Sequence, residues 1–411
     1  MTVIEIPKTF EEIPRSFMDK NVNLVFLGLF PYPHGMAGTK RIQHAIDAFK
    51  ADFKVMIHVI ILYQSSKQNI LKGEYEGTVY ETMLGDLYGM KKAIFLPLLY
   101  IRTIRALKRS WRRDCKNILY NYGSITVDNF IALLYAKHLG YKIVLDIVED
   151  YDAAKSISVT FLNRLNVAFI SWLEAKAKDV ASGIIVISRH LERKYANLVQ
   201  GSLPIHYRPI SVDMKRFRLV NNAKKNGVSL LYAGTFGKKD GILVLLDAFN
   251  KLAAKRKNVR LTLSGRGTAE EMRAFFSRME LSPYKDRIDY RGYIDEEEYY
   301  FLLSSIDVAC MTRIELAYAH AGFPFKLGEF LASGKPVIAS RVSDVESFLA
   351  DRQNAMLVRP GSSDEIVEAA EYLIDQPEAA RKIGEEGRKV AGSVFDYRAQ
   401  GEALLSFLKS L

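Results

Sequence analysis

The chain has 411 residues, 49% of them hydrophobic and 26% charged, a composition typical of globular proteins and long enough for two domains. Its 58 lysine and arginine residues exceed its 47 acidic residues by 11, which favours anionic partners such as nucleotides or acidic lipids. The sequence has no apolar run of about 20 residues, no hydrophobic leader in its first twenty residues and two cysteines that fit no metal-ligand spacing, so we expect a cytoplasmic protein rather than a membrane-spanning or secreted one.

The first half of the chain predicts an α/β domain. An apolar strand opens at Val22, and a glycine-containing loop and an amphipathic helix ending near Phe49 follow it. Further apolar strands are predicted at residues 55–62, 118–122, 143–147 and 183–188, with helical patterns between them. Such alternation of strands and helices is typical of a parallel sheet.

A basic segment interrupts this pattern. Nine basic residues lie between Lys91 and Lys116, with Asp114 as the single acid among them. Over residues 94–116 the basic side chains follow a three-and-four spacing, and the apolar ones favour another side of the same helix. This pattern predicts a helix that lies on an anionic membrane surface, although a core-packed helix with a solvated basic face has the same pattern. No nucleic-acid recognition module accompanies the charge, so we do not expect nucleic-acid binding.

A second α/β domain is predicted beyond a hinge between Gly201 and Gly227, which lacks apolar periodicity. We therefore divide the chain into a first domain (1–205), a second domain (206–395) and a C-terminal helix (396–411). The second domain opens like the first, with a strand, a glycine loop and a helix from Ser229 to Phe249. More strands are predicted at residues 260–264, 288–292, 307–312, 336–339 and 355–358.

The most informative motif lies between Gly322 and Ser340. A short buried helix is predicted after Pro324, with Lys326 and Glu329 three residues apart on one face. The free N–H groups and positive dipole of a helix start can bind a pyrophosphate beside Lys326, and Glu329 can accept hydrogen bonds from both ribose hydroxyls. The structural alternative is that Glu329 offsets the helix dipole and that Lys326 is solvated.

This string resembles the donor-site motif of retaining glycosyltransferases of family 4, which have the GT-B fold: two Rossmann-like domains that face each other across a cleft. In the Pro-x-Lys-x-x-Glu variant of the motif the lysine and the glutamate belong to the nucleotide-sugar pocket, which implies that Lys326, Leu327 and Glu329 lie there. The first glutamate of the family's Glu-x7-Glu pair would fall at Ala321. The resemblance extends from about Val22 onward and implies that the C-terminal helix crosses back onto the first domain.

The resemblance also assigns ligand contacts to two glycine loops. Gly35 and Gly38, after the first strand, let main-chain amides approach a phosphate or the donor sugar. In the loop from Gly234 to Gly241, relatives carry an arginine after the first glycine and a lysine before the last one, whereas this chain has Thr235 and Asp240. We predict that Lys239 or Lys238 takes over the phosphate contact; the alternative is that both are solvated turn lysines.

Three further side chains are candidates for the same site. Arg266, in the turn Ser264–Gly267, can pair with phosphate, and Tyr293 can stack on the base; the alternatives are a surface arginine and a tyrosine that lines the end of the sheet. Relatives often carry a histidine near the transferred sugar where this chain has Val148. Glu149 or Asp150 can instead contact the acceptor hydroxyl, although a pair of acids at a helix start is an equal alternative.

The sequence therefore predicts a retaining glycosyltransferase that moves a sugar from a nucleotide diphosphate sugar to a hydroxyl of a glycan or lipid-linked acceptor, in cell-surface glycan or polysaccharide synthesis. Lys326, Lys239 and Glu149 are the predicted catalytic residues, and the scheme requires no metal or other cofactor. The main alternative is a non-catalytic GT-B subunit that binds a nucleotide or a partner enzyme at the membrane, and the departures at Thr235, Val148 and Ala321 motivate it. A sugar-nucleotide epimerase of the same architecture has no further sequence support.

Overall fold

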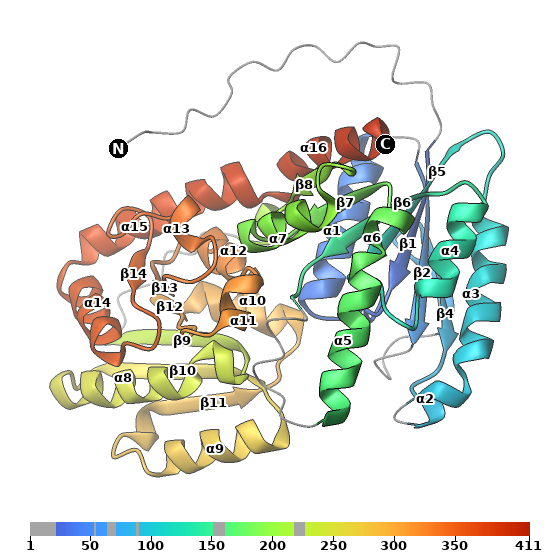
Figure 1. Ribbon diagram of the computed structural model, residues 1–411. Helices are drawn as coiled ribbons and strands as arrows, with labels where there is room; N and C mark the ends of the chain where they lie inside the picture. The colour runs from blue at the N-terminus through green and yellow to red at the C-terminus, as the bar shows by residue number, and fades with distance from the viewer. Residues whose placement is uncertain (1–21, 53–54, 64–70, 88–89, 151–160, 218–226) are drawn as a thin grey trace.

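The computed structural model describes residues 22–52, 55–63, 71–87, 90–150, 161–217 and 227–411, and it shows two α/β domains side by side (Figure 1). The first domain is built on an eight-stranded sheet and the second on a six-stranded sheet. The strands predicted from the sequence are all present, and the two-domain α/β architecture is confirmed.

The first sheet has the strand order β3-β4-β2-β1-β5-β6-β7-β8, and every neighbouring pair is parallel except β3 and β4. Its strands are β1 (Val22–Gly28), β2 (Val55–Tyr63), β3 (Lys72–Tyr75), β4 (Thr78–Leu84), β5 (Lys116–Tyr122), β6 (Lys142–Ile147), β7 (Gly183–Val186) and β8 (Ile205–Tyr207). The sequence did not predict the β3–β4 hairpin, because β3 is a four-residue edge strand with a charged, half-exposed pattern. The helices of this domain are α1 (Ala37–Asp52), α2 (Met90–Ile94), α3 (Leu96–Ser110), α4 (Phe130–His138), α5 (Phe161–Ala175), α6 (Ala177–Val180) and α7 (Arg189–Val199).

The second sheet is parallel throughout, with the order β11-β10-β9-β12-β13-β14. Its strands are β9 (Val228–Thr235), β10 (Val259–Arg266), β11 (Ile288–Gly292), β12 (Val308–Met311), β13 (Val337–Ser340) and β14 (Met356–Val358). The helices are α8 (Ile242–Lys255), α9 (Ala269–Glu280), α10 (Glu296–Ser305), α11 (Ala317–Ala321), α12 (Phe325–Ala332), α13 (Val345–Phe348), α14 (Ser363–Asp375) and α15 (Pro377–Val390). In this strand order the chain reverses direction across the sheet between β9 and β12, and ligands of open α/β sheets bind beyond the carboxyl ends of the strands at such a point.

The two chain segments that connect the domains are hydrogen-bonded to each other. The Val212 amide donates to the Phe395 carbonyl oxygen at 2.7 Å, and the Tyr397 amide donates to the Val212 carbonyl oxygen at 3.1 Å. Helix α16 (Tyr397–Ser410) then returns to the first domain and lies on α1, as expected (Figure 1). The predicted hinge lies partly in residues 218–226, outside the described residues, as do the first twenty residues on which the leader prediction depends.

The prediction of one basic helix over residues 94–116 is wrong. Helix α3 ends at Ser110, and Lys116 opens the central strand β5. The Asn117 side chain explains the break, because it accepts a hydrogen bond from the Arg112 amide at 2.9 Å and donates to the Arg112 carbonyl oxygen at 2.7 Å. These bonds hold the backbone in a turn that a continuing helix cannot form. In the part of the chain that the structure describes, no helix is both long and apolar enough to cross a bilayer.

Candidate functional site

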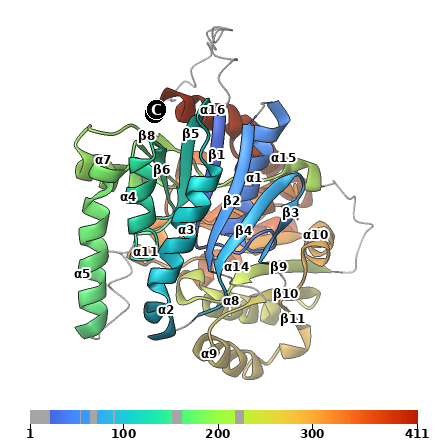
Figure 2. The same ribbon diagram turned by 90° about the vertical axis from the view of Figure 1, so that its right-hand side faces the viewer.

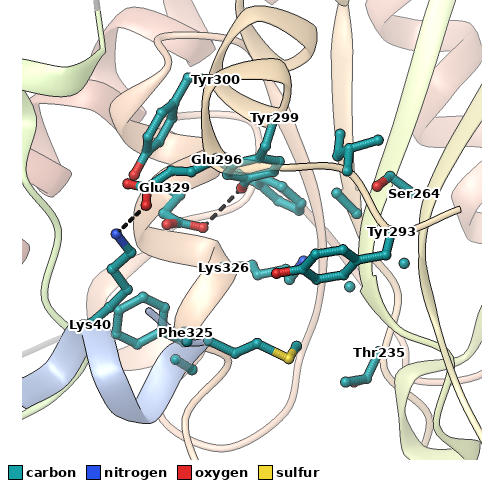
Figure 3. A pocket seen from close by; sticks show the side chains of 18 of the residues that line it. Lys40, Thr235, Ser264, Tyr293, Glu296, Tyr299, Tyr300, Phe325, Lys326 and Glu329 are labelled. Atoms are coloured by element: carbon teal, nitrogen blue, oxygen red, sulfur yellow. Dashed lines mark hydrogen bonds and ion pairs between the residues drawn. The ribbon is translucent and has the colours of Figure 1, made fainter. Parts of the chain in front are cut away.

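A cleft of about 540 Å³ lies between the two domains. The first domain lines it with the loop after β1 and the first turn of α1, and the second domain lines it with the carboxyl ends of β9, β10 and β12 and the start of α12. Helix α10 also lines the cleft, and Figure 3 shows Tyr299 of this helix pointing toward Glu329 of α12. The cleft thus occupies the place where the topology of the second sheet predicts a ligand.

Helix α12 presents Lys326 and Glu329 to the cleft because its other face is apolar. Leu327, Phe330 and Leu331 are buried against the core, which leaves the intervening polar residues on the cleft side. The Tyr299 hydroxyl donates to a Glu329 carboxylate oxygen at 2.9 Å, and the Lys326 ammonium lies 5.6 Å from the centre of the Tyr299 ring (Figure 3). A Cβ atom on Gly234 would come within 3.4 Å of the Lys326 ammonium, so a glycine at this strand end keeps space beside the cation.

The cleft changes the acid–base properties of this pair. Burial lowers the pKa of Lys326 to about 8, although the charges of Glu329 and Asp240 act in the opposite direction. Burial also raises the pKa of Glu329 above its ordinary value, opposed by the Lys326 charge and by the hydrogen bond from Tyr299. The charge of Lys326 therefore titrates close to neutral pH, where an anionic ligand would stabilise it.

An ion-pair bridge between residues that line the cleft joins the two domains. The Lys40 ammonium, on α1, lies 2.6 Å from a carboxylate oxygen of Glu296, on α10 (Figure 3). Arg216 pairs with the same carboxylate. The sequence analysis missed this bridge, because nothing local relates residues so far apart in the chain. It fastens the first domain to the second beside Lys326 and Glu329.

Three of four further predicted ligand contacts line the cleft, and the fourth, Gly38, lies in the first turn of α1. Gly35 lines it, and a Cβ atom there would come within 2.0 Å of the Thr39 hydroxyl oxygen, so no larger residue fits. Gly38 packs against Tyr122, whose hydroxyl oxygen would be 2.8 Å from an added Cβ atom. The Arg266 guanidinium stacks 4.9 Å from the centre of the Tyr293 ring, which is 57% exposed.

A second cavity of about 720 Å³ adjoins the cleft and lies in the first domain, beyond the carboxyl ends of β1, β5 and β6. Val148 and Glu149 line it, and Arg266 and Tyr293 border both cavities. Asp150, the alternative candidate for the acceptor contact, is buried and pairs with Lys194 at 2.6 Å. Of the two acids, Glu149 is thus the one that faces the cavity.

The structure places the remaining predicted residues outside the cleft. Leu327 has a fully buried side chain and its amide donates to the Pro324 carbonyl oxygen at 3.0 Å, so it packs the core rather than the pocket. Lys238 is exposed on the outer side of its loop, and neither it nor Lys239 is among the residues that line the two cavities. Burial lowers the pKa of Lys239, and the neighbouring charge of Arg313 lowers it further.

Arg313 is a cleft residue that the sequence analysis missed. It lies two residues after the end of β12 and lines the cleft. Its position after a predicted parallel strand was the available signal, since side chains just beyond the carboxyl ends of such strands face the ligand crevice.

The residues that depart from the family motif have internal partners. The Thr235 hydroxyl donates to a carboxylate oxygen of Asp240 at 2.6 Å. Ala321 is buried, and its carbonyl oxygen accepts a hydrogen bond from the Ser188 hydroxyl at 2.6 Å. Across the described residues, no group of His, Cys, Asp and Glu side chains is arranged to hold a metal ion.

Comparisons with known proteins agree with this architecture. Residues 213–390 match the family model of glycosyl transferases group 1. The MMP alpha-(1->4)-mannosyltransferase of Mycolicibacterium hassiacum is 29% identical over 236 residues, which cover 56% of this chain and 54% of that protein. The chain spans about half the length of the curated relatives that it matches first: 54% of this mannosyltransferase and 46% of the EpsD protein of Bacillus subtilis.

Solved structures match over almost the whole chain. The sucrose-phosphate synthase of Thermosynechococcus elongatus has a TM-score of 0.75 and 16% identity, covering 94% of this chain and 98% of that one. The Anabaena protein HepE in complex with UDP-glucose has a TM-score of 0.72 and 13% identity, covering 94% of this chain and 100% of that one. The chain therefore has the GT-B fold.

Proposed function

We propose that this protein is a retaining glycosyltransferase of family 4 that transfers a sugar from a nucleotide diphosphate sugar to a hydroxyl group. The observation that carries the proposal is the pair Lys326 and Glu329, which faces the cleft at the start of α12 inside the region that matches the group 1 family model. A relative of the same fold is known in complex with UDP-glucose, which supports a nucleotide sugar as the donor. The bound donor would span the cleft, with its diphosphate beside Lys326 and its ribose on Glu329.

Charge stabilisation on the leaving diphosphate would supply most of the rate enhancement. The bond between C1 of the donor sugar and the β-phosphate oxygen breaks, and that oxygen keeps the electron pair. The acceptor oxygen bonds to C1 from the same face, and its proton passes to a phosphate oxygen. Lys326 stabilises the negative charge that grows on the leaving oxygen, and no resident metal is needed in this scheme.

The second cavity would hold the acceptor. It opens onto the donor cleft at Arg266 and Tyr293, so a hydroxyl bound there can reach the sugar carbon. Glu149 lines this cavity and can orient the attacking hydroxyl by accepting a hydrogen bond from it. A glycan or lipid-linked acceptor would fit a role in cell-surface glycan or polysaccharide synthesis.

An exposed face of the first domain supports contact with the inner face of an anionic membrane. Helices α3 and α4 lie in front of the first sheet in Figure 2, and α5 lies beside α4, where Phe130 and Trp172 form an edge-to-face contact at 6.3 Å. Apolar side chains are exposed on all three helices: Ile101, Ile131, Leu134, Phe169 and Trp172. Arg105 and Lys108 add exposed positive charge. Exposed apolar groups with flanking cations are the features that bind a protein to anionic lipid.

Part of the basic cluster has an internal role instead. Arg109 forms two hydrogen bonds of 2.9 Å with Glu81, and Arg102 donates to the Met83 carbonyl oxygen at 2.8 Å. These contacts fasten α3 to β4. The membrane proposal therefore depends on Arg105, Lys108 and the apolar residues rather than on the whole basic segment.

A non-catalytic nucleotide-binding subunit is the second candidate. The specific observation in its favour is that Thr235 and Asp240, where relatives carry cations, bond to each other. Two measurements on the purified protein separate the candidates: thermal shift with UDP, GDP, ADP and TDP, and release of free sugar or product from labelled donors with and without lipid-linked acceptors. Nucleotide binding raises the unfolding midpoint in both cases. Turnover supports the transferase, whereas binding without any transfer or hydrolysis supports the subunit.

A further inference from the structure

Arg313 lines the same cleft as Lys326, the one cation that the proposed mechanism places beside the leaving diphosphate. The cation positions of the loop from Gly234 to Gly241 hold Thr235 and Asp240, so the loop itself offers a carboxylate to the cleft. The Arg313 side chain is 14% exposed, and its Nε atom lies 3.6 Å from a carboxylate oxygen of Asp240. Within the described part of the chain, its guanidinium makes no hydrogen bond. Guanidinium N–H groups thus remain available to a ligand in the cleft.

The backbone fixes this arrangement. Gly241 has a φ of +69°, and a Cβ atom there would fall 1.8 Å from the Thr312 carbonyl oxygen. The Ile314 amide donates to the Lys239 carbonyl oxygen at 3.0 Å. The loop after β12 is therefore fastened to the loop after β9 on both sides of Arg313, and a group held in this way stabilises charge without reorganisation.

The charges around Asp240 point to an anion. A carboxylate oxygen of Asp240 lies 3.6 Å from Nε of Arg313, and the charge of Asp240 raises the pKa of Lys326, so one carboxylate lies near two cations on the same side of the cleft. A diphosphate carries more negative charge than one carboxylate and can accept several hydrogen bonds at once. It would outcompete Asp240 for both cations.

We infer that Arg313 binds the β-phosphate of the donor and, with Lys326, stabilises the departing diphosphate, in place of the cations that the glycine loop lacks. Asp240 holds the guanidinium in place before the donor binds, and the guanidinium then leaves Asp240 and pairs with the β-phosphate. This inference rests on the proposed function, because it assigns a further catalytic residue to the same donor site. It also explains how the site can act despite Thr235 and Asp240.

The role of Arg313 is tested by calorimetry on the full chain with two nucleotides. One is the nucleoside diphosphate that gives the largest thermal shift, and the other is the matching monophosphate, which has no β-phosphate. Arg313→Ala should weaken diphosphate binding by at least tenfold and lower kcat by about 10²- to 10³-fold, while monophosphate affinity stays unchanged. Arg313→Lys should restore part of both losses. Asp240→Asn should strengthen diphosphate binding, because it removes a competing negative charge. This gain should be smaller in the double variant with Arg313→Ala, where only the competition for Lys326 is relieved.

Arg273→Ala, at an exposed arginine of α9 in the same domain, is the matched control and should change neither quantity. Equal affinities of Arg313→Ala and the wild type for the diphosphate overturn the inference, and so does an equal loss for both nucleotides, which indicates a merely structural role. A wild-type protein that binds none of the four diphosphates overturns the proposed function itself, and the inference with it.

Discussion

Lys326→Ala is the most direct test of the donor site. The side chain is a partly buried cation on the cleft side of α12. In the proposed mechanism its loss removes a preorganised positive charge beside the leaving oxygen. Removing one such donor costs about 10² to 10³ in kcat, equivalent to about 2.7–4 kcal/mol. Donor binding should weaken by only about tenfold, because the charge on that oxygen is larger in the transition state than in the bound donor.

The pH dependence provides a second measurement on the same residue. The pKa of Lys326 is lowered to about 8, so about 90% of the free enzyme carries the cation at pH 7 and about 10% at pH 9. The kcat/KM for the donor should be level below pH 8 and fall as pH rises through that value. Lys326→Arg keeps its charge at every accessible pH, so the decline should disappear in this variant.

Initial rates of transfer or donor hydrolysis, measured with a chelator present, give kcat and KM for each variant. Lys382→Ala, at an exposed lysine of α15, serves as the control for removal of a lysine from the second domain, and circular dichroism establishes that each variant is folded. The reasoning is refuted if Lys326→Ala changes KM but leaves kcat unaltered, or if wild-type kcat/KM shows no decline above pH 8.

Three further results are expected. Glu329→Gln should weaken binding of UDP by about 10- to 150-fold, because a charge-assisted hydrogen bond to the ribose is lost. Binding of the corresponding deoxynucleoside diphosphate, which lacks one of the two hydroxyls, should weaken by less. Equal losses in calorimetry would remove Glu329 from the ribose contact. Reversal of Arg105 and Lys108 to Glu should abolish co-sedimentation with anionic liposomes, whereas the same reversal at Arg273 and Lys382, exposed on the second domain, should not. Unchanged sedimentation of the first pair contradicts membrane contact by this face. Gly401→Leu should lower the free energy of unfolding by about 1–3 kcal/mol in urea titration, because a Cβ atom at this position lies 2.5 Å from that of Ala48 on α1. The control Glu402→Leu, on the exposed side of α16, should have little effect. Equal losses in the two variants would show that α16 does not pack as described.

The sequence by itself determined the elements and much of the fold. Each predicted strand is a short apolar run, and each is followed by a helical pattern, so local periodicity was enough to predict two parallel α/β domains. The spacing of Lys326 and Glu329 likewise fixed their common face, since residues three apart on a helix point the same way. The apolar residues between them had to be buried, which turned this face toward the cleft.

The tertiary structure alone decided which charges face the cleft and which are neutralised. Arg313 lies beside Asp240, Lys40 pairs with Glu296, and Arg109 pairs with Glu81. These partners are far apart in the chain, and no periodicity relates them. Their contacts follow from which strand ends meet and which helices cross, so a basic residue in the sequence reveals its charge but not its partner. The packing of β12 beside β9 likewise brings Arg313 to the cleft, and no periodicity in the sequence predicts that it lies beside Asp240.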